Sequence, residues 1–169
     1  MGTVDATDMY RAAVVQSVAA LDSYIHDIVL DLAVDIVLGV RTPGSTSRLG
    51  LHFGAVSEVV TAATQVEREL RARAVVNDRL STETFQKADD IAKALAIVGV
   101  KGIWKIAFPA DPQAAILALN LVVTRRNQIA HRCDLDPANP PALLPLSDND
   151  ALDAVETIEN TVTGVDAVI

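Results

Sequence analysis

The chain has 169 residues, a formal net charge of −8 at pH 7, and a composition that is 50% hydrophobic but only 4% aromatic. This length suits one domain with a sizeable core. The acidic balance is opposite to that of a general nucleic-acid binder, so any RNA contact must come from a local basic patch. It also suits a basic protein partner.

Cysteine and histidine usage limits the kinds of site that the chain can form. The single cysteine, Cys133, excludes a disulfide or a multi-cysteine zinc site within this sequence, and the three histidines lack metal-motif spacing. We therefore expect no metal ion, no cofactor and a reducing, cytoplasmic location. Residues 1–13 do not have the pattern of a signal peptide. The most apolar run, residues 25–40, carries one histidine and three aspartates, which predicts a soluble protein rather than a bilayer span.

The first half of the chain predicts two helices joined by a loop. Apolar residues recur at helical intervals from Thr7 to Leu38, and the Gly-, Pro-, Ser- and Thr-rich residues 39–52 form the loop. A second helix is expected over residues 53–77. Its second half offers two i,i+4 ion pairs on a solvated face, Glu67 with Arg71 and Glu69 with Arg73.

A third helix is expected to begin after Ser81 as N-cap, with Glu83 in its first turn, and to continue through residues 85–99. Gly99 and Gly102 then end the helical pattern. The segment 100–108 is expected to be a loop or short turn in which Trp104 serves as a core anchor.

The last part of the chain has clear helix boundaries. Asp111 as N-cap and Pro112 at the first position open a fourth helix, which continues to Cys133 and stops at the proline-rich loop 134–146. Ser147 and Asp150 resemble a capping box that opens a fifth helix. No segment alternates with the period of a half-buried strand. The sequence predicts an all-α fold of about five helices in one domain, 1–169.

The stretch RRNQIAHR, residues 125–132, concentrates basic groups on the fourth predicted helix. Asn127 and His131 are four residues apart and share one face, whereas Arg126 lies roughly 140° around the cylinder from His131 at about 100° per residue. Histidine can transfer a proton near neutral pH, and arginine can bind a phosphate and stabilise charge on its oxygens. Asparagine can orient either group. These groups are sufficient for metal-independent RNA cleavage, in which the ribose 2′-hydroxyl attacks the adjacent phosphodiester.

The same charges also have a purely structural explanation. Basic side chains in the last turns of a helix favourably oppose the negative end of its macrodipole. Arg125, Arg126, His131 and Arg132 all lie in the final third of the predicted helix. Residue chemistry alone therefore leaves both interpretations open.

The arrangement RRNQIAHR resembles the signature of the HEPN superfamily, an arginine followed by four to six residues and a histidine. Arg126, Asn127 and His131 match it as RNxxxH, near the end of a long penultimate helix. The segments LDSYIHDIV and RLSTETFQKADDIAKALAIVGVKGIW are similar to the RiboL-PSP-HEPN branch and its relatives. The resemblance extends from about Tyr10 to Cys133.

The resemblance implies a helical bundle that forms a homodimer with two copies of the motif facing one another in a composite site. It implies a metal-independent endoribonuclease of a toxin–antitoxin or antiviral-defence system, with RNA as substrate and an antitoxin or other protein as partner. His131 would transfer protons, Arg126 would bind the phosphate and Asn127 would orient one of them. Arg125 and Arg132 would add RNA-backbone contacts.

Two other interpretations remain open, a catalytically inactive HEPN-like interaction or regulatory module, and a plain helical scaffold. Among the remaining candidate residues, His26 is expected to be a helix histidine with a hydrogen-bond partner in the fold, although it could line the cleft of the composite site. His52 is expected to be exposed. Cys133 is expected to be a small buried thiol. Asp134 and Asp136 are expected to end the helix as turn residues or to tune His131.

Overall fold

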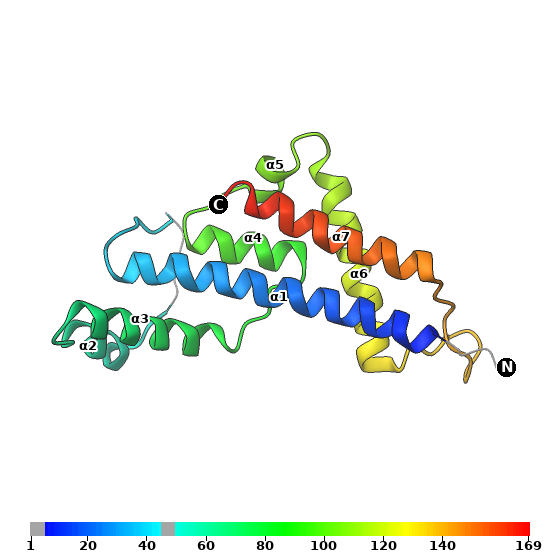
Figure 1. The fold of residues 1–169 in the computed structure, drawn as a ribbon, viewed down its shortest axis with the longest axis horizontal. Coiled ribbons are helices and arrows are strands. Elements are labelled where there is room, and N and C mark those ends of the chain that lie inside the picture. The colour runs from blue at the N-terminus through cyan, green and yellow to red at the C-terminus, as the bar shows by residue number, and fades with distance from the viewer. Residues whose placement is uncertain (1–5, 45–49) are drawn as a thin grey trace. The chain divides into compact units, whose positions relative to one another are not determined.

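The computed structural model describes residues 6–44 and 50–169, and the regular elements in this part of the chain are all α-helices (Figure 1). They are α1 (Thr7–Val37), α2 (Phe53–Val60), α3 (Gln65–Leu80), α4 (Ala88–Ile97), α5 (Ile103–Ala107), α6 (Pro112–Arg132) and α7 (Asp148–Asp166). The proline-rich loop adds an isolated antiparallel bridge between Leu135 and Leu143. The all-α prediction is confirmed, with seven helices among the described residues where about five were expected. Part of the predicted loop 39–52, residues 45–49, lies outside the described residues.

The long first helix is confirmed and ends within one residue of its predicted end. Its length and composition alone would also allow α1 to cross a membrane. However, fully buried residues recur along it every three or four positions, which is the pattern of a helix in the core of a soluble-type helical protein. These residues are Val14, Val18, Leu21, Ile25 and Val29.

The predicted second helix is two helices, so the expectation of one continuous helix over residues 53–77 is wrong. The side chain of Thr64 accepts a hydrogen bond from the amide of Glu67, and the Glu67 carboxylate accepts one from the amide of Ala63 at 2.8 Å. These contacts satisfy amides at the start of α3, which is why the chain can begin a new helix there. Of the two expected ion pairs, Glu67–Arg71 forms, whereas Arg73 pairs with Asp31 on α1.

The sequence predicts that Ser81 opens a helix, and this prediction is wrong, because Ser81 ends one. It is the C-cap of α3, which continues to the buried Leu80 and thus beyond its predicted end. The next helix begins only at Ala88, whose amide donates to the side-chain oxygen of Asn120 at 3.2 Å. The start of α4 therefore depends on a residue 32 positions later in the chain, and no local sequence signal reveals it.

The caps predicted for the last two helices of the chain are confirmed. The Asp111 carboxylate accepts a hydrogen bond from the amide of Ala114 at 2.9 Å, with Pro112 as the first residue of α6. Ser147 and Asp150 form the reciprocal contacts of a capping box at the start of α7. The segment 100–108, expected to be a loop or short turn, instead contains the helix α5, in which Trp104 is buried and donates from its indole nitrogen to the carbonyl of Ala88 at 2.9 Å. The expected role of Trp104 as a core anchor is confirmed.

The described residues form two compact units. The first comprises the chain up to Asp22, together with Gln86–Ala88 and Trp104–Ile169, and the second comprises Ser23–Phe85 and Asp89–Ile103. Each has its own buried apolar residues. They include Val18, Leu119, Val123 and Ile158 in the first unit, and Ile25, Val76, Ile91 and Leu95 in the second. The stretch 125–132 lies in the first unit, and the single-domain organisation stays a prediction.

The capping box predicts how acid acts on α7. Hydrogen bonds from the backbone amide and hydroxyl of Ser147 lower the pKa of Asp150 below its ordinary value of 3.8. Because the pKa is depressed in the folded state, this contribution is fully present above the unfolded pKa and is lost as pH falls through the folded pKa. We expect Asp150→Asn to destabilise the protein at pH 7, and the difference from the wild type to shrink below pH 4.

Urea unfolding at a series of pH values measures this difference. Asp148→Asn is the matched control, because it removes a carboxylate from the same helix turn without touching Ser147. A difference between wild type and Asp150→Asn that stays constant down to the acid limit would contradict the assignment.

Candidate functional site

The stretch RRNQIAHR forms the last two turns of α6. The helix ends because Cys133 and Asp134 both adopt left-handed backbone conformations, with φ of 51° and 54°. The amides of both residues donate to the carbonyl of Gln128, which satisfies a backbone acceptor at the helix end. The predicted end of the helix near Cys133 is confirmed. The thiol of Cys133 is exposed at this turn, so the prediction that it is buried is wrong.

Arg126 and Asn127 contact one another directly. The Arg126 guanidinium donates from Nη1 to the Asn127 side-chain oxygen at 3.0 Å, and both residues are half-buried. The Nε of Arg126 is buried and has no hydrogen-bond partner among the described residues. Asn127 thus fixes one end of the guanidinium and leaves a strong donor unsatisfied.

His131 lies apart from this pair. Its side chain is exposed and forms no hydrogen bond or ion pair with the residues that the structure describes. Helical geometry separates it from Arg126 by roughly 140° at about 100° per residue. Arg132 is likewise exposed. A single chain therefore brings together Arg126 and Asn127, and leaves His131 facing solvent.

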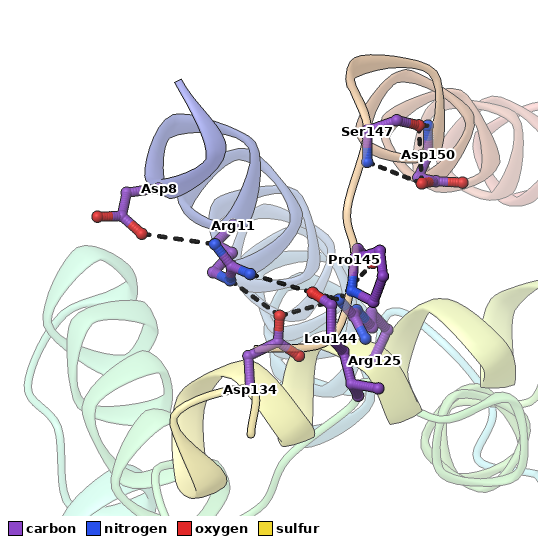
Figure 2. A network of polar contacts seen from close by, with 8 residues as sticks. All are labelled: Asp8, Arg11, Arg125, Asp134, Leu144, Pro145, Ser147 and Asp150. Carbon is purple, nitrogen blue, oxygen red and sulfur yellow. Dashed lines mark hydrogen bonds and ion pairs between the residues drawn. The ribbon is translucent and has the colours of Figure 1, made fainter. Parts of the chain in front are cut away.

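Arg125 points into a network within its own unit (Figure 2). It donates from Nη2 to the Oδ2 of Asp134 at 2.9 Å, to the carbonyl of Pro145 at 3.1 Å and to that of Leu144 at 3.3 Å. Its guanidinium is thus engaged by groups of the same chain. The predicted role of Arg125 in RNA binding stays a prediction, since such a contact would have to compete with these partners.

The centre of this network is the buried carboxylate of Asp134. The residue is only 1% exposed, and its Oδ2 accepts a second ion-paired hydrogen bond, from the Nε of Arg11 at 2.8 Å. Arg11 also donates to the carbonyl of Leu144 at 3.1 Å. Two guanidiniums therefore compensate one buried negative charge, which would otherwise be costly to remove from water. No sequence pattern reveals this ion pair, because Arg11 and Asp134 are 123 positions apart.

The other candidate residues have structural surroundings. His26 lies 3.3 Å from the carbonyl of Leu80 through Nε2, with its ring centroid 4.4 Å from that of Phe85. His52 is exposed and caps α2, as its Nδ1 accepts from the amide of Ala55. Asp136 accepts from the amide of Ala138 at 2.9 Å, as a turn residue does. The expectations for these three residues are confirmed.

The end of α6 therefore offers an oriented arginine, an exposed histidine and an exposed second arginine. In residues 6–44 and 50–169, no group of three side chains of the kinds that ligate metals lies together. Arginine and histidine can bind a phosphate and transfer protons without a metal. Comparison with known proteins finds no matching family model, curated protein or solved structure.

Substitution of Asp134 tests whether its buried carboxylate stabilises this end of α6. Asp134→Asn removes the buried negative charge that both largely buried guanidiniums share, so we expect a loss of about 3–5 kcal/mol in the free energy of unfolding. Chemical denaturation measures it. Asp8→Asn is the matched control, because Asp8 also pairs with Arg11 but is 96% exposed, so its loss should be at most about 1 kcal/mol. Equal effects of the two substitutions would contradict the central role of Asp134.

Proposed function

We propose that the chain is a metal-independent endoribonuclease of the HEPN type that acts in the cytoplasm as a homodimer. The observation that carries the proposal is the composition of the last turns of α6, where Arg126 is hydrogen-bonded to Asn127 and His131 is exposed with its ring unengaged. We further propose that the enzyme is a toxin or antiviral-defence effector, with RNA as substrate and an antitoxin or other protein as partner. These roles follow from the resemblance of RNxxxH.

The proposed reaction uses only these side chains and the RNA. The ribose 2′-hydroxyl attacks the adjacent phosphorus and loses its proton to one imidazole, while the bond from phosphorus to the 5′-oxygen breaks. The same imidazole, now protonated, gives this proton to the leaving 5′-oxygen, which yields a 2′,3′-cyclic phosphate and a 5′-hydroxyl. Arg126 stabilises the charge that develops on the phosphate oxygens. In a two-fold symmetric dimer, each site would combine His131 of one copy with Arg126 of the other.

A dimer would also resolve two features of the single chain. His131 faces solvent while Arg126 is half-buried on another side of α6, so a second copy can supply the group that one chain does not bring close. Two copies of residues 125–132 would also concentrate positive charge in a chain of net charge −8. Leu117 is a large exposed apolar residue about 40° from His131 by helical geometry, which favours a protein contact on that side.

The second candidate is an inactive HEPN-like interaction module. A specific observation favours it, namely that Arg125 is engaged by Asp134 and two carbonyls. Fewer free cations then remain at the helix end for RNA binding, and the rest of the chain is acidic. Cleavage assays distinguish the two candidates.

The first experiment compares His131→Asn with His52→Asn, both of which replace an imidazole by an amide. We expect the wild type and His52→Asn to cleave a mixed RNA pool in the presence of EDTA. His131→Asn should be slower by about 10²–10⁴-fold, because proton transfer is lost. The asparagine also preserves an acceptor at the N-cap of α2 in the control. Equal cleavage by both variants would exclude His131 as the catalytic group, and no cleavage by the wild type would favour the inactive module.

The second experiment tests whether the site is shared between two chains. Arg126→Ala and His131→Asn are each expected to be inactive. If each site takes Arg126 from one chain and His131 from the other, subunit exchange between the two variants restores one intact site in every mixed dimer. An equimolar mixture should then recover about a quarter of wild-type cleavage in a two-fold symmetric dimer. No recovery, with exchange verified by native mass spectrometry, would place the whole site within one chain.

A further inference from the structure

A groove of about 520 Å³ lies in the first unit, formed by α1, α6, α7 and the residues that precede α7. Its floor and walls are largely apolar. They include Val14, Ala118, Leu121, Val122, Leu146 and Ala154. Leu121 is 61% exposed, although leucine is among the residues that folding most often buries. The groove thus presents an apolar surface that none of the described residues covers.

The available charge along this groove is negative. Arg125 lines it, but its guanidinium is engaged by Asp134 and by the carbonyls of Leu144 and Pro145. Asp150 and Asp153 also line it, and Asp153 is exposed with no ion pair to any residue in the described ranges. The helix that carries both, α7, contains six acidic residues and no lysine or arginine. An apolar floor is therefore bordered by carboxylates.

The apolar floor and the negatively charged border together restrict the kind of ligand that the groove can bind. Small-molecule sites of similar volume, roughly 300–1,000 Å³, orient their ligands with several convergent polar groups, whereas the available charged groups here are two carboxylates. The same carboxylates repel RNA phosphates. An amphipathic helix fits the groove better, because its apolar side chains can cover the floor while its flanking cations pair with the rim.

We propose that this groove docks an amphipathic helix of a partner protein, with leucine-like side chains against Leu121 and Ala154 and a lysine or arginine beside Asp153. The inference goes beyond the proposed ribonuclease activity and does not depend on it. None of Arg126, Asn127 and His131 lines the groove. Binding can therefore fail while cleavage is observed, and the reverse.

The probe is a displayed library of helical peptides, each with four randomised apolar positions at i, i+3, i+4 and i+7 and randomised Lys or Glu at the flanks. It is selected against the full chain. We expect enriched peptides to carry lysine flanks, and to bind Asp153→Lys and Leu121→Glu at least about tenfold more weakly in fluorescence anisotropy. The matched controls are Glu156→Lys and Leu152→Glu, which make the same changes on α7 outside the groove. Leu152 is 64% exposed, close to the value for Leu121.

Three results would overturn the proposal. One is that enriched peptides bind the groove variants and the controls equally, or carry no excess of lysine. Another is that a labelled single-stranded RNA binds the wild type and gains affinity only in Asp153→Lys, which would identify a nucleic-acid groove. The third is that Leu121→Glu, but not Leu152→Glu, converts a dimer into a monomer in sedimentation, which would make the groove an interface between copies of this chain.

Discussion

The buried carboxylate of Asp134 is the constraint on which the candidate site depends. It is shared by Arg11 from α1 and Arg125 from α6, and both arginines also bind the carbonyl of Leu144 in the proline-rich loop. One negative charge thereby ties three segments of the first unit together. Because a buried carboxylate without compensation is costly, neither arginine can leave without penalty. The left-handed turn at Cys133 and Asp134 brings that carboxylate back toward α6.

This network divides the basic stretch 125–132 into parts with different roles. Arg125 holds the fold together, Arg126 is half-buried and bound to Asn127, and among the titratable side chains of the stretch only His131 and Arg132 are exposed. The sequence presents these residues as one cluster, whereas the helix distributes them around its circumference. A ribonuclease site built from them therefore needs groups from a second chain, while an interaction module needs no such assembly. The same geometry makes the dimer a condition of the proposed catalysis.

Helix boundaries that depend on hydrogen bonds between residues close in the sequence could be predicted from the sequence. The caps at Asp111 and Ser147 are of this kind, and both form as expected. Thr64 and Glu67 carry an equally clear signal, but the apolar pattern continues across it and suggested one helix where there are two. The start of α4 at Ala88 and the partner of Asp134 could not be predicted, because they depend on residues 32 and 123 positions away. Long-range contacts, rather than propensities, decide these features.

Arg125 gives the candidate site and the groove a physical connection. Arg125 lies six residues before His131 in the chain. It lines the groove, and it also binds the Asp134 carboxylate that fixes the end of α6. A helix docked in the groove would contact the same side chain that holds this end in place. Such contact couples the groove to the candidate site only if the docked helix favours a second arrangement of the ion pair between Arg125 and Asp134. Without one, docking would add a partner while leaving the position of His131 unchanged.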